Sequence, residues 1–315
     1  FRPSYREIAN VIVNLKTRPV VSAFTATATN IVKKDIINLL HLQNPFTLTT
    51  GFDRANLKFS VQIPENKNKY ILNFLQNQND IPGIIYCATR KLVDNLFEKL
   101  TECGYKVSKY HGGMNESARA KSQDDFVFDR TNIMIATNAF GMGIDKPDVR
   151  YVIHYNMPKN MESYYQEAGR AGRDGEPADC LLLYGSRDVV TNQMFIDNNR
   201  DNEELDDVTR AIVAERDRER LKKMTFYCFT NDCLREYILR YFGEYGSGYC
   251  GNCSNCKMQF EETDVTEIAK SIVGCVAECR ERYGTTVILD AVHGAATAKI
   301  RNYHMDGNSH YGELA

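Results

Sequence analysis

The sequence has no tryptophan and no apolar run that approaches the ~20 residues of a membrane-spanning helix. Its net charge is only -2 at pH 7, so any surface that binds nucleic-acid phosphates must be a local cluster of basic side chains. No glycine is followed by lysine, which excludes the phosphate-binding loop G-x-x-x-x-G-K-[ST]. No aspartate is followed by glutamate either. The sequence therefore gives no indication of a membrane partner, and these absences exclude a complete phosphate-binding site within it.

The composition is otherwise that of an ordinary globular protein, with 43% apolar and 25% charged residues. The 315 residues allow two or three domains at ~150 residues each. The segment Phe1–Tyr5 contains neither an initiator methionine nor a signal peptide, and we expect it to lie within a longer chain. Most cysteines outside one tight cluster lie in apolar patterns, which predicts reduced thiols in a cytoplasmic protein, nucleoid-associated if bacterial. They are Cys87, Cys103, Cys180, Cys228, Cys275 and Cys279.

Short apolar runs alternate with helical patterns between about residues 60 and 190. Continuous runs such as Gly83–Cys87 are typical of strands that are buried on both faces. This alternation predicts an α/β fold with a parallel sheet and right-handed crossovers. The expected strands are 83–87, 106–110, 133–136, 149–155 and 180–184, and the expected helices are 92–100, 115–128 and 160–168.

Small residues, hydroxyl groups and cationic side chains follow three of the expected strands, in segments 88–91, 111–113 and 137–145. Ligands of parallel sheets bind at the carboxyl ends of the strands. Glycine-rich loops allow close approach to phosphates. An ordinary tight turn is the alternative for each loop, but it does not explain why all three share this composition on one edge of the sheet.

Two arginines, Arg170 and Arg173, each follow a glycine in the segment Gln166–Gly175. Burial of an unpaired guanidinium is costly, and a glycine within a helix costs roughly 1 kcal/mol relative to alanine, so a core role explains neither feature. A helix end that approaches a negatively charged partner would explain both, because the planar guanidinium fork suits a phosphoryl group. The alternative is a surface ion-pair cluster, which leaves the glycines unexplained; its carboxylates would be Glu162, Glu167 and Asp174.

Three segments of the sequence together resemble motifs VI, V and III of superfamily 2 helicases. They are Gln166–Gly175, Thr137–Asp145 and Ser22–Ala28. The amino-acid sequences of segments 140–147 and 164–167 are similar to those of the RecQ DNA helicases. The resemblance covers essentially the whole chain. RNA helicases of the DEAD-box type usually carry histidine at the position of Gln166.

The resemblance implies a RecA-like motor lobe of a 3′-to-5′ ATP-dependent DNA helicase that acts in repair and recombination. Arg173 would be the finger that reaches the γ-phosphate, Arg170 would support it, and Gln166 would line the same cleft. The implied cofactors are ATP with Mg²⁺, and the implied partner is DNA, single-stranded or at duplex junctions. Further implied positions are Asp145 and Gly143 at the nucleotide, Thr25, Ala26 and Thr27 in coupling, and Thr89, Arg90, His111, Thr137 and Asn138 along the DNA backbone.

The two missing patterns lie upstream of these motifs in RecQ proteins. Phe1–Tyr5 resembles the end of the aromatic-rich loop that follows the Asp-Glu motif, so residues 1–50 would be the last portion of a first lobe. We therefore expect this chain to lack ATPase activity by itself. The alternative function is a non-enzymatic, zinc-stabilised DNA-binding module. An RNA helicase is disfavoured by Gln166 and by the cysteine cluster described next.

Four cysteines follow the pattern Cys233-x₁₆-Cys250-x₂-Cys253-x₂-Cys256. Four thiolates without a nearby histidine predict a closed, structural Zn²⁺ site. Disulfides and an iron–sulfur cluster are the alternatives. RecQ proteins carry a zinc-binding subdomain with this spacing, so the resemblance agrees. We expect the neighbouring basic and aromatic side chains to pack against the zinc loop rather than to contact DNA; they are Arg235, Tyr237, Arg240, Tyr241 and Tyr245.

The remaining sequence predicts helices only. The highly charged segment Arg200–Lys223 suggests a solvated connecting helix, and apolar residues at intervals of four suggest a helix over Ile268–Tyr283. Thr286–Val292 and Lys299–Tyr303 would begin a helix-turn-helix. In RecQ proteins a winged helix starts here, and we expect this one to be truncated. The predicted domains are 1–50, 51–195, 196–262 and 263–315.

Overall fold

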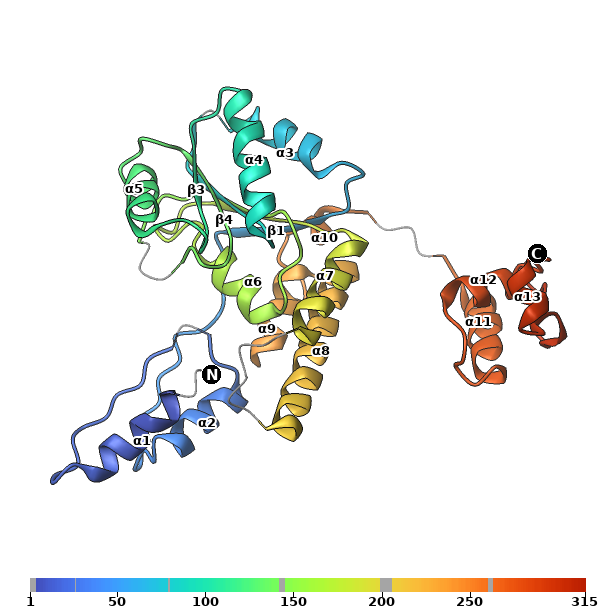
Figure 1. Cartoon of the computed structure of the whole chain (residues 1–315), viewed down its shortest axis with the longest axis horizontal. Coiled ribbons are helices and arrows are strands. Elements are labelled where there is room, and N and C mark those ends of the chain that lie inside the picture. Colours follow the sequence, from blue (N-terminus) through green and yellow to red (C-terminus); the bar gives the residue numbers. More distant parts are fainter. Residues whose placement is uncertain (1–3, 26, 79, 142–144, 199–205, 260–262) are drawn as a thin grey trace. The chain divides into compact units, whose positions relative to one another are not determined.

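The computed structural model describes residues 4–25, 27–78, 80–141, 145–198, 206–259 and 263–315. Contacts divide the chain into two units, residues 1–259 and residues 260–315, and each has a core of its own. Figure 1 shows the course of the chain through both units. The finer division into four domains stays a prediction. Among the described residues, no helix combines the length and apolarity needed to cross a membrane.

The N-terminal segment contains two helices, α1 (Ser4–Asn14) and α2 (Asn30–Leu39). The Thr29 side chain caps α2 by accepting a hydrogen bond from the Val32 amide. Few of its apolar side chains are buried. They are Ala9, Ile12, Ala28 and Leu40.

A parallel sheet of six strands, in the order β1-β6-β5-β2-β4-β3, forms the centre of the first unit. The parallel α/β architecture was predicted, and the structure confirms it. The sequence prediction missed β1, whose polar residues Lys58, Ser60 and Gln62 interrupt the apolar pattern of an edge strand. The strands are β1 (Leu57–Gln62), β2 (Gly83–Tyr86), β3 (Val107–Tyr110), β4 (Ile133–Ala136), β5 (Tyr151–His154) and β6 (Ala178–Leu183).

Successive residues of the central strands point to opposite faces of the sheet, and helices cover both faces (Figure 1). Ile85 packs on one face with α3 (Lys67–Leu75) and α4 (Arg90–Glu102). Ile84 packs on the other with α5 (Glu116–Val127), α6 (Met161–Ala168) and later helices. Burial on both faces explains why the sequence of these strands is continuously apolar.

Glycine is required at one position within the sheet. A Cβ added to Gly83 would lie 2.0 Å from the aromatic ring of Tyr151 on the neighbouring strand. The Tyr151 ring therefore fills the space above Gly83 and is itself buried. This pairing fixes the position of β5 against β2.

Side-chain caps begin the helices that leave the carboxyl edge of the sheet. Thr89 accepts from the Leu92 amide at α4, Asn115 from Ala118 at α5, and Asn160 from Ser163 at α6. The cap by Asn115 begins the helix that was predicted over residues 115–128. Each cap fixes where its helix starts relative to the preceding strand.

Four helices complete the first unit. They are α7 (Ser186–Asp197), α8 (Asp207–Phe229), α9 (Leu234–Phe242) and α10 (Ser254–Lys257). The solvated helix predicted within Arg200–Lys223 corresponds to α8, which continues past the predicted segment to Phe229. The first half of α8 carries surface ion pairs such as Arg218–Asp197, whereas Met224 and Tyr227 in its second half are fully buried against the core of the sheet. Tyr227 contacts Tyr164 of α6 through both rings and hydroxyls.

The second unit contains α11 (Thr266–Glu278), α12 (Thr285–Val292), α13 (Ala298–Asn302) and the short helix η1 (Met305–Gly307). Helices α12 and α13 lie at the two positions where the sequence predicted helices, and their assignment to a helix-turn-helix stays a prediction. The helix predicted to run to residue 283 ends at Glu278, because Arg280 and Glu281 adopt positive φ values. A small core of Cys275, Ile288, Ala291, Val292, Ile300 and Met305 joins these elements.

Candidate functional site

The two arginines after α6 have different environments. Arg170 is only 8% exposed, and its Nη1 donates to the Gly141 carbonyl at 2.7 Å. Arg173 lies on the surface, and its Nη1 is 3.0 Å from Oδ1 of Asp145, with side-chain exposures of 36% and 88%. The loop therefore carries one internal guanidinium and one that can reach a ligand.

Gly141 leaves the space that Arg170 occupies. A Cβ on Gly141 would lie 2.2 Å from Nη2 of Arg170. The hydroxyl of Tyr86 is adjacent and donates to the Phe140 carbonyl at 3.1 Å. Burial raises the pKa of Tyr86, so the hydroxyl stays neutral and acts as a donor. Arg170 thus connects the loop after α6 to the loop after β4.

Gly172 is needed for packing within the chain. Its φ is +53°, and a Cβ there would lie 2.4 Å from Nδ2 of Asn56 and 2.6 Å from the Glu176 carbonyl. The sequence predicted that this glycine allows a negatively charged partner to approach. The structure replaces that interpretation, because the close approach is made by the protein itself.

The carboxylates of the alternative ion-pair cluster have other partners. Asp174 accepts from Nη2 of Arg150 at 2.5 Å, and Glu167 is 2.9 Å from Nε2 of the buried His154. The pair with Arg150 lowers the pKa of Asp174. These contacts hold the loop on β5 and leave Asp145 as a surface partner of Arg173.

A buried lysine fixes the chain beside Asp145. Lys146 is 4% exposed, and its Nζ lies 2.6 Å from Asp129 and 3.1 Å from Asp148. Burial lowers the pKa of Lys146, but the two carboxylates outweigh burial and raise it, so the lysine stays charged. Asp145 is consequently exposed on a firmly anchored segment.

The predicted DNA-contacting residues at the carboxyl edge divide into an open and a buried group. Arg90 and Asn138 are exposed, and Thr89 is half-buried because it caps α4. Arg90 lies along the Gly112–Gly113 backbone, where a Cβ on Gly113 would be 3.2 Å from its Cδ. Only this open group presents side chains that a backbone phosphate can approach.

His111 and Thr137 are buried, which the sequence did not indicate. Nε2 of His111 is 3.3 Å from Asp94, and its Nδ1 lies 3.2 Å from the Gly113 amide. Asp94 also accepts from Lys109 at 2.6 Å, and this hydrogen bond is the main cause of its lowered pKa. His111 therefore shapes the glycine loop rather than facing outward.

A cavity of about 490 Å³ opens beside this edge, between β2, β5 and α7, and the sequence analysis did not predict it. Asn156 lines it, accepts from the Ala88 amide at 3.1 Å, and donates to Asp188 at 2.8 Å. Asp188 is buried and paired with Lys67 at 2.8 Å. This network joins the loop after β5 to the loop that carries Thr89, and no motif in the sequence signals it.

The remaining predicted positions lie at the surface or outside the described residues. Gln166 is exposed on the last turn of α6. Thr25 is exposed and Thr27 half-buried in an irregular segment before α2. Ala26 and Gly143 lie outside the residues that the structure describes. The roles assigned to these positions stay predictions.

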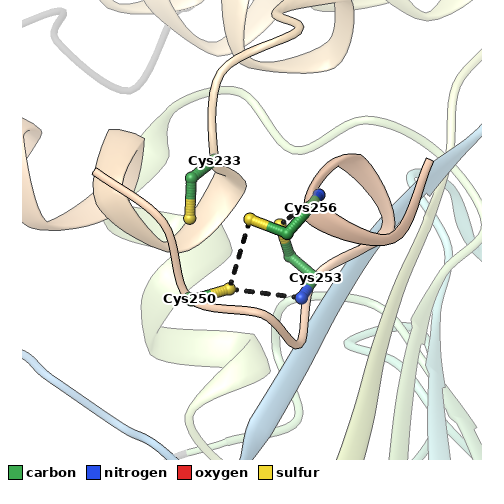
Figure 2. A group of neighbouring side chains, drawn as sticks. All are labelled: Cys233, Cys250, Cys253 and Cys256. Atoms are coloured by element: carbon green, nitrogen blue, oxygen red, sulfur yellow. Dashed lines mark hydrogen bonds between the residues drawn. The ribbon is translucent and has the colours of Figure 1, made fainter. Parts of the chain in front are cut away.

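The structure brings the four cysteines together, as Figure 2 shows. Cys233 precedes α9, Cys250 lies on the following loop, and Cys253 and Cys256 lie at the start of and within α10. All four Sγ atoms lie within 4.8 Å of one another, and those of Cys250 and Cys256 are 3.9 Å apart. A tetrahedral Zn²⁺ with Zn–S bonds of about 2.3 Å requires sulfurs separated by roughly 3.8 Å, so this donor set fits zinc.

The backbone supports thiolates at this site. The amides of Asn252 and Cys253 donate to Sγ of Cys250, and the Cys256 amide donates to Sγ of Cys253. Burial raises the pKa of Cys250, but these amide hydrogen bonds and the neighbouring thiols outweigh it and lower the value to about 7. Figure 2 shows the dashed contacts around Cys250.

The neighbouring side chains contact elements other than the cysteine loop, so their predicted packing on that loop stays a prediction. Tyr237 contacts Tyr227, and Tyr241 contacts Phe242, in both cases edge to face. Arg235 pairs with Asp53. Tyr245 is exposed.

Comparisons with known proteins agree with these observations. Residues 66–175 match the helicase conserved C-terminal domain, residues 186–257 the RecQ zinc-binding domain, and residues 259–315 the RQC domain. The ATP-dependent DNA helicase RecQ of Bacillus subtilis is 40% identical over 314 residues, which are 100% of this chain. The chain belongs to the RecQ family of helicases. The zinc-binding match contains all four cysteines, which supports a structural zinc.

This RecQ chain spans only part of its relatives. It covers 52% of the Bacillus subtilis protein and 22% of the ATP-dependent helicase SGS1 of Saccharomyces cerevisiae, to which it is 36% identical over 99% of its own length. Among solved structures, S. cerevisiae Dbp5 bound to RNA and ADP BeF3 matches with a TM-score of 0.52 and 21% identity. That match covers 70% of this chain and 60% of Dbp5, and it supports the RecA-like fold.

Proposed function

We propose that this chain is the finger-bearing lobe and zinc module of an ATP-dependent DNA helicase that unwinds DNA in the 3′-to-5′ direction, in repair and recombination. The observation that carries the proposal is that one loop holds both an internal arginine, Arg170, and a surface arginine, Arg173. A protein that only binds DNA has no need for a braced arginine beside an exposed carboxylate such as Asp145. The 3′-to-5′ direction and the biological role are what the resemblance of the motifs to RecQ helicases implies, and a cytoplasmic location is part of the same proposal.

Each residue would have a defined task in the reaction. ATP with Mg²⁺ would supply the phosphoryl group and the counter-charge, held mainly by a phosphate-binding lobe outside this sequence. Arg173 would leave Asp145 and direct its fork of N–H donors at the γ-phosphate, where the negative charge develops during transfer. Arg170 would remain inside and keep the loop in place. Closure of the two lobes would bring the finger to its target.

The open edge of the sheet would hold the DNA backbone. Arg90 provides a charged contact, and Asn138 and the Thr89 hydroxyl provide neutral ones. Since these contacts address phosphates, we expect binding that depends on salt and only weakly on sequence. His111 and Thr137 would act indirectly by shaping the loops.

ATP hydrolysis by two proteins tests this proposal. We expect no DNA-stimulated turnover by the 315-residue chain, because it has neither the Gly-Lys loop nor the Asp-Glu pair. We expect turnover when the same chain is joined at its amino terminus to a phosphate-binding lobe from a RecQ relative. Turnover by the chain alone, or none by the joined protein, would contradict the proposal.

The absence of those two patterns favours one other candidate, a zinc-stabilised module that binds DNA without turnover. Fluorescence anisotropy with single-stranded DNA examines the binding that both candidates share. Arg90→Ala should weaken binding and reduce the salt slope by about 0.7, as expected for one lost phosphate contact on a single strand. Arg130→Ala, at a surface arginine paired with Asp125, is the matched control. Binding by the joined protein without turnover would select the second candidate.

A further inference from the structure

The segment that enters β1 contacts both the zinc module (residues 233–257) and the loop after α6 that carries Arg170 and Arg173 (residues 169–176, the arginine loop). The ring of Phe52 stacks on Phe242 of α9 at 4.3 Å, and its amide donates to both carboxylate oxygens of Glu244 at 3.1 and 2.9 Å. The Phe52 carbonyl accepts from the Tyr165 hydroxyl at 2.7 Å. Asp53, next along the chain, pairs with Arg235. The zinc module therefore holds this segment on two sides.

Arg54 follows and points toward the loop after α6. Its Nη2 donates to the carbonyls of Ala171 at 3.0 Å and Gly172 at 2.8 Å, and its Nη1 lies 3.4 Å from that of Gly169. These carbonyls follow a helix end, where acceptors lack partners within the helix and a positive charge is favourable. A single guanidinium thus satisfies three acceptors on the loop that carries Arg170 and Arg173.

Asn56 completes the contact. Its Nδ2 donates to the carbonyls of Gly172 at 2.8 Å and Glu176 at 2.9 Å, and it fills the space that a Cβ on Gly172 would need. The loop has a positive φ at Gly172 and would lose its shape without partners for these carbonyls. The contacts join residues more than 110 positions apart in the sequence.

We propose that Arg54 is a positioning residue for the arginine finger, and that the zinc module sets the place of Arg54 through Phe52 and Asp53. Arg54 does not touch the substrate in this account. It fixes the backbone from which Arg173 extends, so that the guanidinium is already oriented when the lobes close. The effect on turnover rests on the proposed function, whereas the effect on the loop does not.

Hydrogen–deuterium exchange on the 315-residue chain tests the positioning directly. In Arg54→Gln, the protected amides of Arg170 to Gly175 should exchange about tenfold faster or more, because the loop opens locally, while amides of β2 and β4 keep their rates. Arg54→Lys is the second variant. It keeps the positive charge and should also accelerate amide exchange in the arginine loop, since an ammonium group does not reproduce the planar arrangement of guanidinium donors. Arg130→Gln is the control and should change neither region.

Unchanged exchange in the loop of both variants would overturn the proposal. Equal acceleration throughout the lobe would overturn it too, because it would mean that Arg54 acts only through global stability. Removal of zinc with a chelator should accelerate amide exchange in both segment 51–56 and the arginine loop. Faster exchange in the cysteine loop alone would contradict the proposed role of the zinc module.

The joined protein with its phosphate-binding lobe provides the second measurement. Arg54→Gln should lower kcat for ATP by about tenfold or more and leave KM within about twofold, as expected for loss of an interaction made in the transition state. A raised KM with unchanged kcat would contradict a role in positioning the finger. If the unmodified joined protein hydrolyses no ATP, the proposed function fails, and the exchange experiment still decides the role of Arg54.

Discussion

The RecA-like lobe and the N-terminal segment use the same local signals but differ in what covers their apolar residues. A threonine caps α2 as another caps α4. In the lobe, however, Ile85 and Ile135 are completely buried between helix layers. In the N-terminal segment, Val20 is 97% and Phe24 95% exposed. Capping and helical periodicity therefore give helices in both regions, whereas a packed core forms only where another layer is present.

The exposed apolar residues of the N-terminal segment extend over both of its helices and its connections. Besides the two named above, they include Val11, Val13, Ile31, Phe46 and Leu48. Monomeric proteins rarely leave such surfaces uncovered.

Zinc removal should have the largest effect, and it should spare the N-terminal segment. The cysteines and α9 belong to the same core as the sheet, and structural zinc contributes an apparent ~10–16 kcal/mol in small domains. We expect Cys253→Ser to lose zinc and to lower the melting temperature of the lobe. Metal analysis and calorimetry measure both. Cys103→Ser, at an exposed thiol, is the control. Full zinc content in Cys253→Ser would contradict the assigned ligand set.

Gly83→Ala should destabilise the lobe by about 3 kcal/mol or more, because the new methyl would overlap the Tyr151 ring. Urea unfolding monitored by tyrosine fluorescence measures this change. Gly307→Ala is the matched control, since no atom lies within 4 Å of the position where its Cβ would be. An unchanged free energy of unfolding in Gly83→Ala would mean that the sheet accommodates the Tyr151 ring elsewhere. The contrast between a tightly packed and an open region would then weaken.

The stability contributed by Asp94 should depend on pH. Lys109 holds the pKa of Asp94 below its ordinary value of 3.8 in the folded protein. A depressed folded pKa stabilises above the unfolded value, and this contribution is lost as the pH falls through the folded pKa. Asp94→Asn should therefore destabilise more at pH 7 than at pH 3. In a Lys109→Gln background most of that difference should disappear; an undiminished difference would assign it to another group.

Phe24→Ser should have the smallest effect, within about 0.5 kcal/mol, because the ring is already in contact with solvent. Unfolding of the chain alone measures this. In a protein where a phosphate-binding lobe precedes the chain, the same substitution should become costly if that lobe covers the segment. An equal effect in both proteins would remove the explanation for the difference between the two regions.

The sequence predicted the layers of the fold and the residue types of the site, and its failures have physical reasons. Continuous apolar runs identified β2, β4 and β5, but the alternating polar residues of β1 concealed an edge strand. Cysteine spacing identified the zinc ligands because thiolates on one short loop have few other uses.

Contacts between distant residues could not be predicted in this way. The sequence carries no signal that Arg54 meets the loop after α6, or that Lys146 is buried between two carboxylates. The burial of His111 was missed for the same reason, since its partner Asp94 lies on another element. The motifs therefore predicted candidate positions, while the contacts around these positions required the structure.

Arg173 is the proposed arginine finger, and turnover by the joined protein tests this role most directly. Single-turnover ATP hydrolysis should fall about 10³-fold or more in Arg173→Ala, with DNA binding unchanged, whereas Arg130→Ala should retain full activity. A loss of less than about tenfold in Arg173→Ala would contradict the account, because the surface guanidinium beside Asp145 would then have no part in catalysis.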